Sequence, residues 1–132
     1  MIQDYRNLFS LEGKNALVTG GAQGLGLSIA EAFCAAGAVV TIADINEESV
    51  NAAANELCEQ GGTVYAVTCD VSNEEQVAAM VRTAAEKMGG LDVMVANAGV
   101  STRAPAEEMT LDQWNRVIDI DLKGVFLCDR EA

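Results

Sequence analysis

Four short apolar segments alternate along the chain with segments whose apolar residues recur at helical spacing. The apolar segments cover residues 16–18, 39–43, 63–69 and 91–96. Continuous apolar strands are typical of a parallel sheet that is buried on both faces, and helices between them supply right-handed crossovers. The pattern therefore predicts an α/β fold with a doubly wound parallel sheet.

The helical segments carry recognisable start and stop signals. Helices are expected from about residue 27 to 36, from 47 to 59 and from 72 to 88, each followed by glycine. Ser72 with Glu75 resembles a capping box at the start of the third of these helices. A longer helix is expected from Leu111, capped by Thr110 with Gln113 three residues on. The apolar face of this helix must pack against another surface, and it is formed by Leu111, Trp114, Ile118, Leu122 and Val125.

A glycine-rich turn joins the first apolar segment to the first helix. It runs through Thr19, Gly20, Gly21, Ala22, Gln23, Gly24, Leu25 and Gly26. Glycine at such a turn lets a phosphate approach backbone N–H groups that a side chain would shield. Taken alone the spacing is a weak indication of nucleotide binding, because glycines gather in turns for many reasons. Asp44 strengthens the indication of nucleotide binding. This residue ends the second apolar segment, at about the distance from the glycines where an acidic residue meets an adenosine ribose.

Length and charge narrow the classes of protein and partner. The 132 residues suit one domain, and half of them are hydrophobic, as in a globular protein. The formal net charge of −12 argues against a general nucleic-acid or anionic-membrane surface. No apolar run reaches the roughly 18 residues of a membrane span, and residues 1–6 lack the order of a signal peptide. A cytoplasmic location is therefore expected.

The cysteines predict no special chemistry. Cys34, Cys58, Cys69 and Cys128 are far apart in the sequence and stand in apolar surroundings. Buried free thiols are expected at all four positions, rather than a metal site or a disulfide framework.

Several motifs together resemble the short-chain dehydrogenase/reductase family. They are the residues 13–20 before the turn, the glycines up to Gly26, the pair Asp70 and Val71, the triplet Asn97, Ala98 and Gly99, and the late stretch from Trp114 to Phe126. They occur in the order and at the spacing of that family over nearly the whole chain. The resemblance implies a Rossmann-type fold, a nicotinamide cofactor, a small-molecule alcohol or ketone substrate and a homo-oligomer.

The resemblance assigns roles to residues on the adenosine side. Asp44 is expected to accept both ribose hydroxyls and to repel the 2′-phosphate of NADP, so NAD is the expected cofactor. Gln23 and Ile45 agree, because NADP-using members often have a basic residue at these places. Asp70 is expected at the adenine amino group and Val71 beside the adenine, although the pair also suits a plain strand exit before a helix.

On the nicotinamide side the resemblance points to Asn97, Ala98 and Gly99. These residues follow the fourth apolar segment, at the edge where open α/β sheets bind ligands. Asp121 stands where family members have an asparagine whose main-chain carbonyl holds a water of the proton relay. Asp121 is therefore a candidate catalytic residue, and Arg103 is a weaker candidate for a substrate contact.

The family's catalytic serine and its Tyr-x-x-x-Lys pair have no counterpart among these residues. Tyr5 is followed four residues on by Phe9, and Tyr65 by Cys69. The chain is thus expected to be one dinucleotide-binding domain over residues 1–132, incomplete relative to the family and truncated after about four strands and the following long helix. A non-catalytic nucleotide-binding or assembly module remains an alternative, while the spacing from Thr19 to Gly26 disfavours an S-adenosylmethionine methyltransferase.

Overall fold

The computed structural model describes residue 5 and residues 7–132. Residues 1–4 and 6, which make up most of the segment considered above for a signal peptide, lie outside the described residues. The strands are β1 (Asn15–Thr19), β2 (Val39–Asp44), β3 (Thr63–Thr68) and β4 (Val93–Val95). The helices are α1 (Gly24–Ala35), α2 (Glu47–Glu59), α3 (Glu74–Met88), α4 (Leu111–Val117), η1 (Ile118–Gly124) and α5 (Val125–Glu131).

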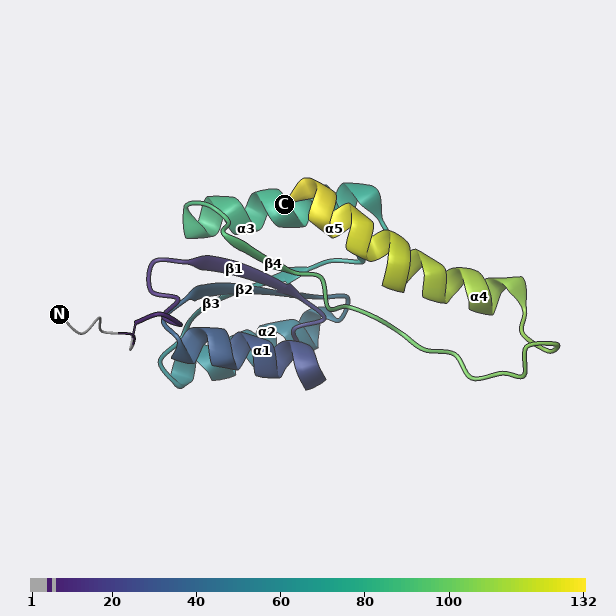
Figure 1. Cartoon of the computed structure of the whole chain (residues 1–132), viewed down its shortest axis with the longest axis horizontal. Coiled ribbons are helices and arrows are strands. Elements are labelled where there is room, and N and C mark those ends of the chain that lie inside the picture. The colour runs from purple at the N-terminus through teal and green to yellow at the C-terminus, as the bar shows by residue number, and fades with distance from the viewer. Residues whose placement is uncertain (1–4, 6) are drawn as a thin grey trace.

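The four strands form one parallel sheet in the order β3-β2-β1-β4 (Figure 1). β1 pairs with both β2 and β4, so Leu17 lies between Thr41 and Met94. The strand order reverses at β1, because β2 and β3 lie on one side of β1 and β4 lies on the other. The predicted doubly wound α/β fold is confirmed.

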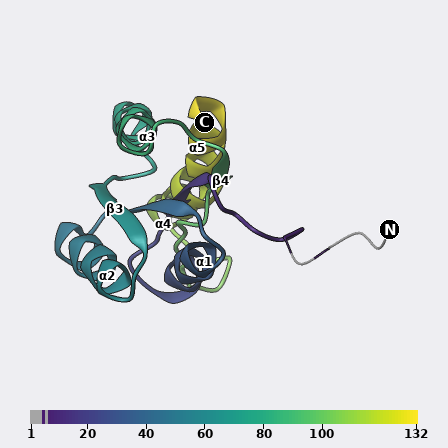
Figure 2. The same ribbon diagram turned by 90° about the vertical axis from the view of Figure 1, so that its left-hand side faces the viewer.

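Helices cover both faces of the sheet (Figure 2). α1 and α2 lie against one face, and α3 and α5 lie against the other. Successive strand residues point to opposite faces, so Leu17 packs in the cluster under α3 and α5 while Val18 packs in the cluster under α1 and α2. Both side chains are fully buried, which explains why β1 is apolar without alternation.

Asparagine and threonine side chains cap α2, α3 and α4. Asn46 accepts a hydrogen bond from the Ser49 N–H at the start of α2, and Thr110 forms the expected capping box with Gln113. The expected box at Ser72 is wrong, because Asn73 is the N-cap of α3. Asn73 wins because its side chain reaches the Gln76 N–H at 3.0 Å, while the Ser72 hydroxyl donates to Asp70.

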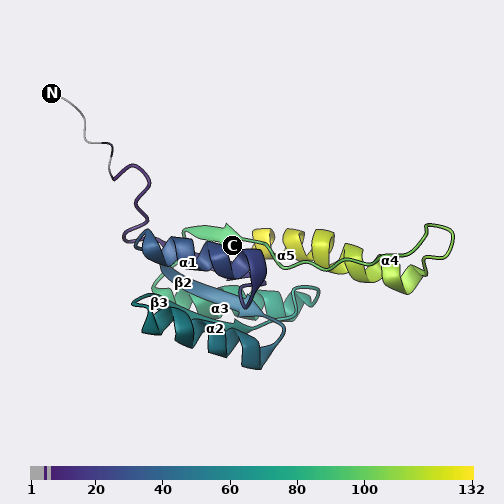
Figure 3. The same cartoon turned by 90° about the horizontal axis from the view of Figure 1, so that it is seen from below.

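The long C-terminal helix consists of three segments. η1 is π-helical, and it joins α4 to α5 without a break in the chain. α4 and the loop before it extend beyond the sheet (Figures 1 and 3). Large apolar side chains on this helix are exposed, with Leu111 at 77%, Trp114 at 56%, Leu122 at 64% and Phe126 at 58%.

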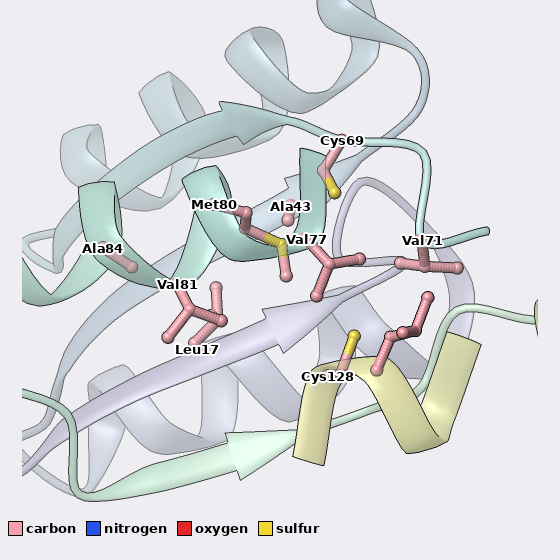
Figure 4. Packing of buried hydrophobic residues seen from close by; sticks show 10 residues of the cluster. Leu17, Ala43, Cys69, Val71, Val77, Met80, Val81, Ala84 and Cys128 are labelled. Atoms are coloured by element: carbon pink, nitrogen blue, oxygen red, sulfur yellow. The ribbon is translucent and has the colours of Figure 1, made fainter. Parts of the chain in front are cut away.

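The cysteines are free, but only two of them are buried. Cys69 and Cys128 belong to the core cluster between the sheet and α3 and α5 (Figure 4). Cys34 is half-buried and Cys58 is exposed, so burial was wrongly expected for these two. Cys58 lies on the exposed side of α2, where its thiol donates to the Val64 carbonyl at 3.4 Å, while the preceding Leu57 is buried.

In the part of the chain that the structure describes, no helix combines the length and apolar character needed to cross a membrane. Within the same residues no cluster of three or more potential metal ligands occurs.

Candidate functional site

A cleft of about 770 Å³ opens at the carboxyl ends of the strands. The glycine turn and the start of α1 form one wall, the ends of β2 and β3 form a second, and the loop after β4 with α4 and η1 closes the third. Open α/β sheets bind ligands at this edge, where neighbouring crossovers leave in opposite directions. In this fold that point lies between β1 and β4.

The glycine turn needs glycine for two different reasons. Gly20 has φ of +63° and Gly24 has φ of +57°, which side-chain-bearing residues rarely adopt. Gly26 instead allows close packing, because a Cβ there would collide with the Gly20 carbonyl oxygen and lie 2.6 Å from the Asn97 amide nitrogen. Gly26 therefore brings α1 against the end of β1 and does not line the cleft.

Thr19 and Asn97 tie the ends of β1 and β4 together. The buried Thr19 hydroxyl accepts hydrogen bonds from the backbone N–H of Asn97 at 3.0 Å and of Ala98 at 3.1 Å. In return the Asn97 side-chain amide donates to the carbonyls of Thr19 and Gly20, at 3.0 and 3.3 Å. These reciprocal contacts join the turn after β1 to the loop after β4.

Asp44 stands at the end of β2, beside the glycine turn. Its Oδ2 accepts a hydrogen bond from the Ala22 N–H at 3.3 Å, and its Oδ1 accepts one from the Asn46 N–H at 3.2 Å. The exposed side chain of Ile45 follows it on the same wall of the cleft.

Asp70 and Val71 lie at the end of β3. Oδ1 of Asp70 accepts from both the hydroxyl and the N–H of Ser72, at 2.7 and 2.9 Å. Val71 is buried against Gly124, where an added Cβ would come within 2.9 Å of the valine side chain. The close approach at Gly124 places the long helix against the loop after β3.

Asp121 connects η1 to the loop after β4. Its Oδ1 accepts a hydrogen bond from the Val100 N–H at 2.8 Å. A Cβ on Gly99 would lie 3.4 Å from the same carboxylate oxygen, so the loop passes directly over the Asp121 side chain. Sequence reasoning considered only the main chain of Asp121, and the structure shows a role for its carboxylate.

The structure brings together eleven of the residues singled out from sequence. They line one cleft and are Gly20, Gln23, Gly24, Leu25, Asp44, Ile45, Asp70, Val71, Asn97, Ala98 and Gly99. Thr19, Gly26 and Asp121 lie behind this wall and hold it in place.

Six further residues line the cleft without having been singled out for it. They are Cys69, Ser72, Val100, Arg116, Asp119 and Ile120. Arg116 and Ile120 are four residues apart and so share a helix face. The spacing of these two residues could have indicated that both contact the same part of the molecule. Only the path of the loop before α4 places their helix face over the cleft.

The charged groups of the cleft are mostly acidic. Asp44, Asp70 and Asp119 line it, and Arg116 is the one cation among the described lining residues. Asp119 is engaged by Lys123 at 3.2 Å. Burial raises the pKa of the Cys69 thiol to about 12, with smaller contributions from Cys128 and Asp70, so this thiol stays protonated and is a poor nucleophile.

Comparison with known proteins agrees with this architecture. The family model for short chain dehydrogenases matches residues 14–132. An uncharacterized oxidoreductase of Mycobacterium bovis is 46% identical over 118 residues, which cover 88% of this chain and 47% of that protein. The chain thus spans about half the length of the curated relatives it matches.

Solved structures give the same result. A short-chain type dehydrogenase/reductase from Mycobacterium marinum superimposes with a TM-score of 0.94 at 34% identity, over 98% of this chain and 53% of that one. A short chain dehydrogenase/reductase from Burkholderia phymatum, solved in complex with NAD, has a TM-score of 0.90 at 31% identity, over 93% of this chain and 44% of that one. With its sheet order, its glycine turn and these matches, the chain belongs to the short-chain dehydrogenase/reductase family.

Proposed function

We propose that this chain is the cofactor-binding part of an oxidoreductase that prefers NAD and transfers hydride between an alcohol or ketone and the nicotinamide. One observation carries the preference for NAD: the Asp44 carboxylate stands on the cleft wall beside the glycine turn. A carboxylate can accept the hydroxyls of a ribose, whereas it repels a phosphate at the same place. The NAD complex of the Burkholderia phymatum relative supports the choice of cofactor.

The residues of the cleft fit a dinucleotide. No side chain caps α1 at Gln23, and the first turn of α1 holds no acidic residue, so its N-terminus faces the cleft ready for an anion. Leu25 and Ile45 expose apolar side chains at the rim, at 79% and 67%. A planar base covers such side chains, which are unfavourable in water. The cleft volume also lies in the range usual for ligand sites.

Each part of the cleft then has one task. The turn from Gly20 to Leu25 holds the phosphates, Asp44 the adenosine ribose, and Asp70 with Val71 the adenine. Asn97, Ala98 and Gly99 shape the side for the nicotinamide, and the bound nicotinamide accepts or donates the hydride. Thr19 and Gly26 support these groups from behind.

Asp121 is proposed to serve the proton relay by position. Its carboxylate holds the Val100 N–H and thereby the loop that follows Gly99. The relay itself would use the Asp121 main-chain carbonyl, which lies in the π-helical segment. π-Helical turns occur frequently at functional sites.

Titration with NADH and NADPH, followed by fluorescence of the reduced cofactor, tests the proposal. We expect NADH to bind at least about tenfold more tightly, because a 2′-phosphate would face the Asp44 carboxylate. Asp44→Ala should narrow this ratio, and Gln60→Ala, at the exposed end of α2, should leave it unchanged. Equal affinities in the unmodified protein would refute the role of Asp44, and binding of neither nucleotide would refute the cofactor site.

A further inference from the structure

The glycine turn is held to the end of β2 by two consecutive residues. The Gly21 N–H donates to the Ala43 carbonyl at 3.0 Å, and the Ala22 N–H donates to the Asp44 carboxylate at 3.3 Å. The first contact is between backbone atoms, so no side-chain substitution removes it. The second depends entirely on the Asp44 side chain.

Close packing leaves the turn little freedom at Gly21. A Cβ on Gly21 would lie 2.7 Å from the Ile42 side chain, so the backbone of the turn rests directly on β2. On the other side the Asn97 amide holds the Gly20 carbonyl at 3.3 Å. The turn is thus fixed by β4 through Asn97 and by β2 through Asp44.

The two oxygens of Asp44 hold neighbouring parts of the backbone. Oδ2 accepts from Ala22 in the turn and Oδ1 accepts from Asn46 before α2. Each oxygen has further lone pairs, so the carboxylate can still accept ribose hydroxyls while it holds the turn. One side chain therefore reaches both the ribose region and the phosphate region of the cleft.

We propose that Asp44 is a positioning residue for the phosphate-binding turn, in addition to its proposed contact with the ribose. This inference rests on the proposed cofactor site. The Ala22 N–H that Asp44 holds fixes the direction of the backbone just before Gln23 and Gly24, which line the cleft. Loss of the carboxylate therefore weakens phosphate binding as well as ribose recognition.

The two possible roles of Asp44 predict different outcomes for a substitution that alters cofactor preference. If Asp44 only selected against the 2′-phosphate, Asp44→Ala would improve NADP binding and leave the phosphate turn intact. If it also positions the turn, the same substitution relaxes the preference but lowers affinity for the diphosphate that NAD and NADP share.

A ligand without ribose hydroxyls separates the two roles. We would measure binding of 2′,3′-dideoxyadenosine diphosphate and of ADP to the unmodified chain, Asp44→Ala and Asp44→Asn by calorimetry. For the dideoxy ligand we expect Asp44→Ala to weaken binding about five- to tenfold, as for loss of one hydrogen bond. Asp44→Asn keeps one acceptor oxygen and should restore part of this loss.

Removal of a negative charge acts in the opposite direction, because it favours binding of an anion. Asp119→Asn is the matched control, since Asp119 lines the same cleft and is bonded to Lys123 rather than to the turn. This variant should bind the dideoxy ligand as tightly as the unmodified chain or slightly more tightly. If only Asp44→Ala weakens binding of the dideoxy ligand, the loss is due to a displaced turn and not to the removed charge.

Amide hydrogen exchange gives a readout that needs no ligand. The Ala22 N–H should exchange faster in Asp44→Ala than in the unmodified chain, and at the original rate in Asp119→Asn. Unchanged exchange at Ala22, or an unchanged affinity of Asp44→Ala for the dideoxy ligand, would overturn the positioning role. Failure of the unmodified chain to bind ADP would instead refute the proposed cofactor site, while Ala22 exchange would still report on the turn.

Discussion

At the scale of single residues, the most consequential group is the Thr19 hydroxyl. It is 1% exposed and accepts two backbone N–H groups, from Asn97 and Ala98. Buried N–H groups that lose their acceptor cost more free energy than the original bond contributes, because water cannot replace the partner. Loss of the Thr19 hydroxyl therefore leaves the Ala98 N–H without its acceptor, whereas the Asn97 N–H also donates to the Val95 carbonyl at 3.0 Å.

Thr19→Val tests this directly. The two side chains have nearly the same shape, so the substitution removes the acceptor without opening a cavity. We expect the free energy of unfolding to fall by about 1–3 kcal/mol, measured by urea denaturation, together with weaker NADH binding. Thr19→Ser keeps the hydroxyl but loses a buried methyl group, so it should retain NADH binding at some cost in stability. A Val variant as stable as the unmodified chain would contradict the expectation.

At the scale of elements, the position of α1 depends on the absence of a side chain at Gly26 in its first turn. Gly26 is buried, and the Gly20 carbonyl and the Asn97 amide occupy the space that a side chain would need. The N-terminus of α1 can therefore reach the end of β1, where it faces the cleft. This glycine allows close packing between a helix and a strand, and it does not line the cleft.

Gly26→Ala should therefore move the whole helix. We expect the overpacking to cost about 1–3 kcal/mol of unfolding free energy in denaturant titrations, although alanine favours helices. Ser28→Ala, at an exposed position of the same helix, is the control and should leave stability within about 0.5 kcal/mol. A Gly26→Ala variant that matches this control would refute the steric explanation.

Some helices and strands were predictable from the sequence, and one was not. Strands β1 to β3 were predictable because they are continuous apolar segments. Helices α1 to α3 were predictable because their apolar residues recur at helical spacing and glycine follows each of them. The π-helical form of η1 was not, because its apolar spacing continues that of α4. What sets η1 apart from α4 is tertiary contacts, which local spacing does not encode. Those contacts are Gly124 against Val71 and Asp121 with Val100.

The candidate site likewise contains residues that were predictable from the sequence and residues that were not. Residues on the glycine turn and at strand ends were predictable, since parallel strands bring their carboxyl ends to one edge of the sheet. The contribution of Arg116, Asp119 and Ile120 was not, because it depends on the path of the irregular loop between β4 and α4. Local sequence patterns do not encode the direction of such a loop.

At the scale of the whole molecule, the described surface carries a large apolar face. Leu111, Trp114, Leu122 and Phe126 are each more than half exposed along α4, η1 and α5. Among the described strands, β4 lies at the edge of the sheet and pairs with β1 alone. Exposed apolar faces and open strand edges both favour association.

We therefore expect this 132-residue chain to associate with itself in solution. Sedimentation velocity over a range of concentrations should show species larger than 13.8 kDa. Trp114→Lys together with Leu122→Lys should weaken the association at least about tenfold, because buried aromatic residues dominate interfaces. Asn51→Lys with Gln60→Lys adds the same charge on exposed positions of α2 and should have little effect. A chain that is monomeric at every concentration would contradict the expectation.

The tie between Thr19 and Asn97 also governs when the cleft can form during folding. The two residues are 78 positions apart, and the contact requires β4 to have added beside β1. Pairings of this sequence separation form late, after the entropy of closing a long loop has been overcome. A chain that leaves the ribosome from its N-terminus therefore pairs β1 with β2 early, but it completes the glycine turn and the wall opposite it only when β4 arrives. Nucleotide affinity is then a marker of the last step of folding, and it should appear after the helical signal has already reached most of its native value.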